Sequence, residues 1–182
     1  MSTIKRRPLA TRVSHATGIA AVLLMTSCAT PEPPEFVGVS HWTHFDRGPD
    51  PVHLDDPTGH AEVWIDRLPA HGATTFAVGT HIVRVMGEGD DPTTWEAHGL
   101  VKVGRDFNAD GAAGWEYYGL DASRDANGDL AFATRWHGVG PPDGDGYAHA
   151  GDAGPVLGCN HCHGAATWND SILGPELTLS DF

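Results

Sequence analysis

The residues of this chain best suited to chemistry lie near its C-terminus, in residues 158–170, which read GCNHCHGAATWND. Cys159, Cys162 and His163 form the pattern C-x-x-C-H, the c-type haem attachment sequence. Cysteines three positions apart lie on one face of a helical turn, so both thiols can bond to the two vinyl groups along one haem edge. His163 would then reach the iron as its proximal ligand. The pattern predicts one covalent haem c, held through two thioethers, on a short helix over residues 159–166.

The same residues allow two other interpretations. With His161 added, the motif holds four zinc-type ligands, but four ligands within five positions cannot easily surround a tetrahedral ion. A structural zinc site also needs a second, separated ligand pair, and the chain has no second C-x-x-C. A redox dithiol needs only C-x-x-C and not the histidine that follows. Haem is the favoured interpretation, with zinc and a dithiol as alternatives, and His161 is expected to point away from the iron.

The first residues of the chain have the pattern of an export signal. Four basic residues and no acid precede the apolar run ATGIAAVLLM, and Cys28 follows shortly after. The run is too short for a convincing membrane-spanning helix, and it resembles a bacterial lipoprotein signal. We therefore predict lipidation of Cys28 and anchoring on the periplasmic side of a bacterial membrane, the outer membrane. The alternative is an ordinary secretory signal in which Cys28 has no role. Haem c is attached after export, so the leader and the C-terminal motif agree.

Charge and length limit the partners and the domain count. Removal of residues 1–28, as a lipoprotein-type signal peptide, leaves 154 residues, the size of one domain. We predict a Pro/Glu-rich tether over residues 29–38 and a single haem domain over residues 39–182. Because the leader carries four basic residues, its loss takes the formal net charge from −13 to −17. Such a charge disfavours nucleic acid and favours a basic redox partner protein.

The body of the chain has the composition of a β-rich domain. It is rich in glycine and proline, and short apolar runs alternate with turn compositions. We predict an α+β fold, mainly an antiparallel β-sheet of about five strands with a few short helices, one of which carries the haem motif. Helix is expected near residues 39–45 and is the alternative to strand over residues 61–68. The strands are expected at residues 60–66, 80–86, 97–103, 114–122 and 130–136.

The terminal position of the motif restricts the sixth iron ligand. The residues after His163 contain neither methionine nor histidine, so any sixth ligand must come from the sheet. The candidates there are the histidines of the body and Met86, the only methionine of the mature chain. A methionine on a strand is more often part of a core. The alternative is an open, five-coordinate iron, which binds and transforms small molecules.

Three segments together resemble the cytochrome P-460 / cytochrome c′-beta family, over roughly residues 40–178. They read FAVGTHIVRV, HGLVKVGRDFNADGAAGWEYYGLD and CNHCHGAATWNDSIL. The resemblance implies a monohaem c-type protein with an antiparallel sheet, an open distal side to the haem and commonly a homodimer. Members of the family oxidise hydroxylamine with nitric oxide chemistry, or bind nitric oxide and carbon monoxide. Cys159, Cys162 and His163 carry over as the thioether cysteines and the proximal ligand.

The chain departs from the hydroxylamine-oxidising members at Arg84. In those members the strand matching GTHIVR ends in a lysine bonded to the haem ring, whereas arginine stays protonated and is a poor nucleophile. Lys102 is the only lysine after the leader and does not align with that position, so no lysine–haem cross-link is predicted. The distal acid of the family falls near Glu96 and His98, which with Arg84 are the distal candidates. The alternative is that all three are ordinary surface residues of the sheet.

Two functions follow from these observations. The first is an oxidoreductase that acts on hydroxylamine or nitric oxide at an open haem iron. The second is a non-catalytic gas-binding or electron-transfer cytochrome c, which Arg84 in place of the lysine favours. The segment DFNADG at residues 106–111 begins like a calcium loop, but Tyr117 stands where the loop requires glutamate, so a turn between strands is the better interpretation.

Overall fold

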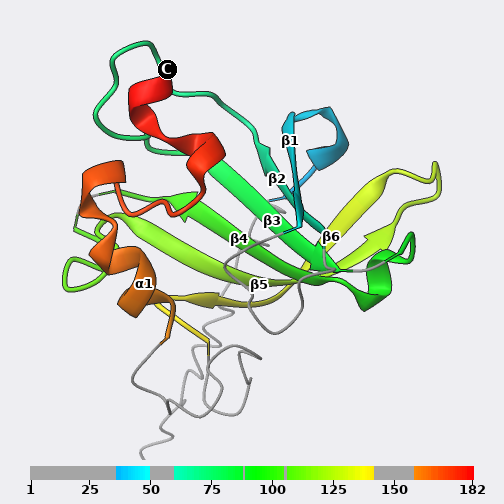
Figure 1. Ribbon diagram of the computed structural model, residues 1–182. Helices are drawn as coiled ribbons and strands as arrows, with labels where there is room; N and C mark the ends of the chain where they lie inside the picture. Colours follow the sequence, from blue (N-terminus) through cyan, green and yellow to red (C-terminus); the bar gives the residue numbers. More distant parts are fainter. Residues whose placement is uncertain (1–35, 50–59, 88, 105, 142–157) are drawn as a thin grey trace, which may run out of the picture. The chain divides into compact units, whose positions relative to one another are not determined.

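A six-stranded antiparallel sheet forms the centre of the computed structural model, which describes residues 36–49, 60–87, 89–104, 106–141 and 158–182. Each strand pairs with its neighbours in sequence, in the order β1-β2-β3-β4-β5-β6 (Figure 1). The strands are β1 Thr43–Pro49, β2 His60–Ile65, β3 His81–Gly87, β4 Glu96–Lys102, β5 Trp115–Arg124 and β6 Leu130–Gly138. The predicted α+β class with a mainly antiparallel sheet is confirmed.

The helical elements are short and are gathered mainly at the C-terminus. The motif helix α1 spans Cys159–Ala165, as the C-x-x-C-H pattern predicts. The 3-10 turns are η1 Val39–His41, η2 Pro92–Thr94, η4 Thr167–Asn169, η5 Pro175–Leu177 and η6 Leu179–Asp181. No helix in these described ranges is long and apolar enough to cross a membrane. The leader, with Cys28, and most of the predicted tether lie outside the described residues.

The sheet has one strand more than predicted, because the helix expected near residues 39–45 was wrong. Helical backbone there is limited to η1, and the chain continues as β1, which pairs Thr43 with Ile65 and Phe45 with Val63. Without β1, the outer edge of β2 would carry unpaired backbone groups. Pairing with β1 satisfies these groups and places Phe45 against the core. The helical alternative over residues 61–68 was also wrong, since β2 alternates its side chains between the two faces.

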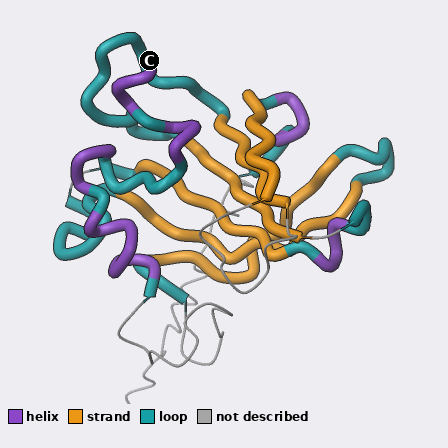
Figure 2. Tube along the Cα trace, in the orientation of Figure 1, coloured by secondary structure: helices purple, strands orange, loops and turns teal. Residues whose placement is uncertain are grey.

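Both faces of the sheet are covered. On one face, which we call the α1 face, Val63, Ile82 and Leu100 pack with the C-terminal residues Ile172 and Leu177. The opposite face buries a second cluster, in which Val83, Val85, Tyr118 and Leu120 pack with Phe36 and Val39. Figure 2 shows the C-terminal turns in purple beside the sheet. The covered α1 face is where a group carried by α1 would meet the strands.

Asn169 holds the C-terminal turns in place. Its side chain is 1% exposed. Its Nδ2 donates to the carbonyl oxygens of Ile172 at 2.8 Å and Leu177 at 3.2 Å, and its Oδ1 accepts from the backbone N–H of Leu179 at 2.7 Å. This one buried amide therefore holds together the segment that follows α1, residues 166–182, which we call the C-terminal coil. A buried amide without these partners would be costly.

Candidate functional site

The two cysteines of the motif lie one turn apart on α1 and differ in burial. Both are free thiols. Cys159 packs against the core of the α1 face, whereas Cys162 is exposed. Burial raises the pKa of the Cys159 thiol to about 11, so this group is protonated at neutral pH. The helix thus presents one partly buried thiol and one exposed thiol, one helical turn apart.

His163 is held in the tautomer that a metal ligand needs. Its Nδ1 lies 2.7 Å from the carbonyl oxygen of Ser171. A carbonyl can only accept, so Nδ1 carries the proton and Nε2 keeps a free lone pair. Burial lowers the pKa of the imidazole, and the nearby positive charge of Arg84 and His98 lowers it further, against the opposing effect of the Ser171 hydrogen bond. The ring is therefore neutral at neutral pH, with Nε2 available for coordination.

A hydrogen-bonded contact between α1 and the β4–β5 loop fixes the position of the helix. The Asn160 Oδ1 accepts from Nδ2 of Asn108 at 2.7 Å and from the N–H of Ala112 at 3.1 Å, and its Nδ2 donates back to Oδ1 of Asn108 at 2.8 Å. The hydroxyl of Tyr117 donates to the same Oδ1 at 3.3 Å. Asn108, at a calcium-like position of the sequence, adopts φ 51°, which asparagine tolerates well. The β4–β5 loop is therefore a turn that is hydrogen-bonded to α1 through the paired side-chain amides of Asn108 and Asn160.

A cavity of about 90 Å³ separates α1 and the C-terminal coil from the sheet. Arg84 on β3 and His98 on β4 stand directly opposite each other in the register of the two strands. Both line this cavity together with His163. Two of the sequence-predicted distal candidates and the predicted proximal ligand therefore face one space. The remaining lining residues are Val63, Ile82, Leu100, Ile172, Leu173, Gly174, Glu176 and Leu177.

The third distal candidate, Glu96, lies beside the cavity and not in its lining. Its Oε1 is 2.8 Å from Nε2 of His98, and both side chains are partly buried. A carboxylate oxygen can only accept, so Nε2 of His98 donates to Glu96 and the carboxylate orients the imidazole. Glu96 can thus act on a bound molecule only through His98.

Lys102 and Met86 lie outside this cavity. The Lys102 ammonium is 2.7 Å from Oδ1 of Asp170 and 3.1 Å from the carbonyl oxygen of Ala113. It also lies 4.9 Å from the centre of the Trp115 ring. Lys102 is four residues beyond His98 on β4, roughly 13 Å along a strand. Neither Lys102 nor Met86 is among the residues that line the cavity, and the absence of a lysine–haem bond stays a prediction.

The donor set of the motif helix is the one that haem c attachment needs. Two free thiols one helical turn apart and a neutral imidazole with an available Nε2 are the groups that bind haem c. In the part of the chain that the structure describes, no three His, Cys, Asp or Glu side chains lie close enough together to hold a metal ion. The cavity has a volume of only about 90 Å³. A porphyrin ring would therefore have to displace side chains of the C-terminal coil, such as Ile172 and Leu177.

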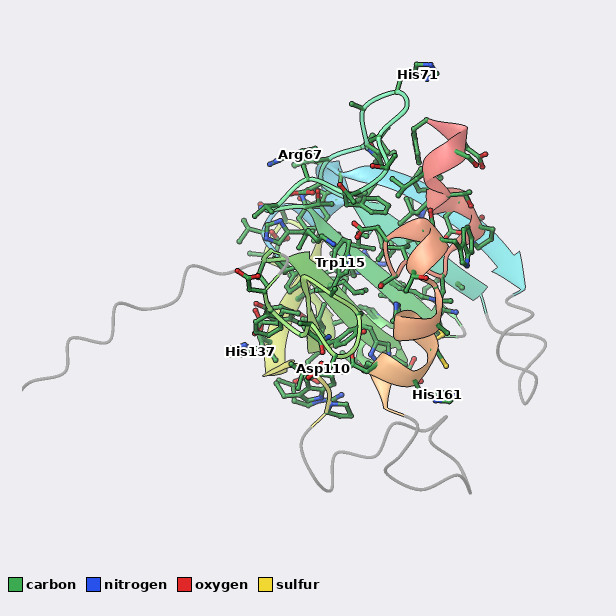
Figure 3. All side chains as sticks on the ribbon, turned by 90° about the vertical axis from the view of Figure 1, so that its left-hand side faces the viewer. Arg67, His71, Asp110, Trp115, His137 and His161 are labelled. Carbon is green, nitrogen blue, oxygen red and sulfur yellow. The ribbon has the colours of Figure 1, made fainter. Side chains whose placement is uncertain are left out.

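His161, the remaining histidine of the motif, is exposed. Figure 3 shows it at the outer end of α1, pointing away from the sheet, whereas Trp115 is fully buried. This position agrees with the expectation that His161 does not face the cavity. The important groups that sequence reasoning missed are Asn160, the Ser171 carbonyl and Asp170. A backbone carbonyl leaves no sequence signal, and a lone amide next to a cysteine is not distinctive.

A larger, open hollow of about 750 Å³ lies on the opposite face of the sheet. His44, Glu62, Trp64 and Arg124 are among the residues that line it, and none of the motif residues or distal candidates does. The smaller cavity is therefore the candidate site, because it is the one that the motif helix faces.

Comparison of the chain with protein-family models, with curated proteins and with solved structures found no match. The resemblance to the cytochrome P-460 / cytochrome c′-beta family thus stays a prediction that rests on the sequence segments named above.

Proposed function

We propose that this protein is an exported, lipid-anchored monohaem c-type cytochrome that acts on or binds small nitrogen species, hydroxylamine or nitric oxide, at an open haem iron. The observation that carries the proposal is the arrangement of His163: the Ser171 carbonyl occupies Nδ1, and the ring lines a cavity shared with Arg84 and His98. The C-x-x-C-H spacing on one short helix supports the same conclusion.

Each residue has a definite task in this proposal. Cys159 and Cys162 would form the thioethers, and Nε2 of His163 would be the proximal iron ligand. Haem bound here would supply a redox-active iron with one coordination position open to a small ligand. The guanidinium of Arg84, which lines the cavity, is a hydrogen-bond donor toward a small polar molecule. His98, oriented by Glu96, is placed to accept a proton from an N–H or O–H group in the same cavity.

The location and partners follow from the leader and the charge. Lipidation of Cys28 would anchor the protein on the periplasmic side of a bacterial outer membrane. A formal net charge of −13 for the full chain, more negative still after the basic leader is lost, suits a basic redox partner that removes or delivers electrons. A homodimer is implied by the family resemblance alone.

A second function, non-catalytic gas binding or electron transfer, is favoured by one observation. Arg84 stands on β3 in the cavity lining, where the hydroxylamine-oxidising members carry the cross-linked lysine. The single lysine of the described residues, Lys102 on β4, is paired instead with Asp170 of the turn that follows α1. Without a cross-link the haem would be an ordinary haem c, and binding without turnover becomes the simpler role.

A haem stain after denaturing electrophoresis tests the cofactor. Chain produced in a host that attaches haem c should stain, because thioether-bound haem survives denaturation. The Cys159→Ser/Cys162→Ser variant should lose the stain, whereas His161→Ala, a change at an exposed position of the same motif, should keep it. An unstained wild-type chain would overturn the haem assignment.

Optical spectra separate the two functions once haem is present. A high-spin iron that binds nitric oxide and oxidises hydroxylamine with an added electron acceptor supports the oxidoreductase. A high-spin iron that binds nitric oxide without turnover supports the gas-binding protein. A six-coordinate, low-spin iron that ignores nitric oxide would exclude both and leave electron transfer. Mass spectrometry of the purified mature protein tests lipidation at Cys28.

A further inference from the structure

A buried ion pair connects the sheet with the turn that follows α1. Lys102 on β4 is 4% exposed, and its Nζ lies 2.7 Å from Oδ1 of Asp170. The other carboxylate oxygen of Asp170 accepts from the backbone N–H of Phe76 at 2.9 Å, and its main-chain oxygen accepts from Nε1 of Trp115 at 2.6 Å. Asp170 is therefore held by three separate segments of the chain. Burying two charges is costly unless the geometry is good and the remaining polar atoms are satisfied, and these contacts meet that condition.

The backbone around Asp170 depends on these contacts. Asp170 has φ 50° and the next residue, Ser171, has φ 68°. Both values lie in the left-handed region, which residues with a side chain rarely occupy. Two such residues in succession persist only where the surroundings hold them. The Ser171 N–H also donates to the carbonyl oxygen of Ala166 at 2.9 Å, so the turn folds back toward α1.

The result of this turn is the contact with the predicted iron ligand. The Ser171 carbonyl, one residue after Asp170, accepts from Nδ1 of His163 at 2.7 Å. A hydrogen bond from the outer nitrogen of a metal-bound histidine fixes the ring and raises its basicity, which in turn sets the properties of the metal. In this protein, the strength of the hydrogen bond between His163 and Ser171 depends on where the turn places the Ser171 carbonyl.

We infer that Asp170 and Lys102 are positioning residues for the proximal ligand, which they control by holding the Ser171 carbonyl against His163. The inference rests on the proposed haem function. A buried ion pair adds little to stability compared with a well-packed apolar pair, so its use at this position is explained by the geometry that it imposes on the turn. Neither residue touches the cavity, and both act only through Ser171.

The test uses the haem-loaded protein and the Asp170→Asn variant. Asparagine tolerates the left-handed backbone and can still accept from the Phe76 N–H, but it lacks the charge that attracts Lys102. We expect a lower iron–histidine stretching frequency in the ferrous protein. At a fixed solution potential we expect the ratio of ferric to ferrous protein to fall about tenfold, a rise of about 59 mV for one electron.

The controls separate positioning from folding. Asp121→Asn removes the acid of an exposed pair with Arg135, at 3.6 Å, and should leave both readouts at their wild-type values. If Asp170→Asn fails to fold, Lys102→Met/Asp170→Asn removes both charges together and should fold with both readouts still shifted. Wild-type frequency and potential in a folded variant that lacks the Asp170 charge would overturn the inference.

Failure of the haem proposal gives a different result. In that case the wild-type chain carries no covalent haem, and the inference is decided by ¹⁵N NMR of His163 in the haem-free chain. Wild-type protein should show the proton on Nδ1, and Asp170→Asn should show a mixture of the two tautomers. An unchanged Nδ1–H tautomer in Asp170→Asn would overturn the inference in this form of the protein too.

Discussion

Replacement of Asn160 by alanine should detach α1 from the β4–β5 loop. The Asn160 side chain accepts hydrogen bonds from the Asn108 amide, the Ala112 N–H and the Tyr117 hydroxyl, and it donates to Oδ1 of Asn108. Ala112 is fully buried, so its N–H cannot turn to water without movement of the loop. The packing is also close, because a Cβ placed on Gly111 would lie 2.2 Å from the Asn160 Cγ.

The expected loss can be worked from these bonds. Each neutral hydrogen bond contributes about 1 kcal/mol net, and a buried donor left unsatisfied costs about 1–3 kcal/mol. Asn160 makes two bonds with Asn108 at 2.7 and 2.8 Å, and it satisfies the buried Ala112 N–H. The Tyr117 bond is long, at 3.3 Å, and is counted as weak. We therefore expect Asn160→Ala to lower the free energy of unfolding by about 3–5 kcal/mol.

Urea unfolding of the haem-free chain measures this loss. Two matched variants give the scale. Asn160→Asp keeps the acceptor oxygen for Ala112 and Asn108 but loses the donor, so it should cost less than alanine. His161→Ala changes the exposed neighbour on the same helix and should stay within about 0.5 kcal/mol of wild type. The reasoning is refuted if Asn160→Ala is as stable as His161→Ala at an unchanged denaturant slope.

Further predictions concern the thiols, the cavity and the ion pair. In haem-free protein at pH 8, iodoacetamide should modify Cys162 much faster than Cys159, because the raised pKa of about 11 leaves only about one Cys159 thiol in a thousand as thiolate. The modification rate of Cys159 should keep rising as the pH approaches 11. Equal rates for the two cysteines on peptide mapping would contradict this prediction. Arg84→Met should weaken nitric oxide binding by the ferrous haem protein about tenfold, because one hydrogen-bond donor is lost. An unchanged dissociation constant in stopped-flow titration would show that Arg84 does not contact the bound ligand. Lys102→Met leaves the buried Asp170 carboxylate without its cation and should lower the free energy of unfolding in urea by about 3–5 kcal/mol. The double variant Lys102→Met/Asp170→Asn should recover most of this loss. A double variant no more stable than the single one would show that the two residues are not coupled.

Local sequence patterns were enough for most of the sheet. Strands with alternating or continuous apolar residues between glycine-rich turns were predicted at five of the six observed positions. The strand that was missed, β1 Thr43–Pro49, follows a short helical turn and carries polar residues among its apolar ones. Its strand conformation depends on pairing with β2, a non-local contact that a local pattern does not reveal.

The candidate site, like the sheet, could be predicted from the sequence only in part. The C-x-x-C-H spacing predicts the motif helix, and the family resemblance names Arg84 and His98, which the register of β3 and β4 places opposite each other. The contacts of Asn160 and Asp170 join residues 43 to 94 positions apart through single side chains and backbone groups. No period or motif marks such contacts, so only the folded structure brings them into view.

These contacts explain how a very short helix can hold a ligand in place. The motif helix α1 has seven residues, and a helix of that length is marginal in water without tertiary support. Asn160 ties its first turn to the β4–β5 loop, and Asp170 ties the turn that follows it to β4 and β5. His163 lies between these two attachments, so its ring can be oriented closely although the helix alone would fray. The rigidity that the proposed haem ligand would require is therefore supplied by the sheet through two polar side chains on either side of His163.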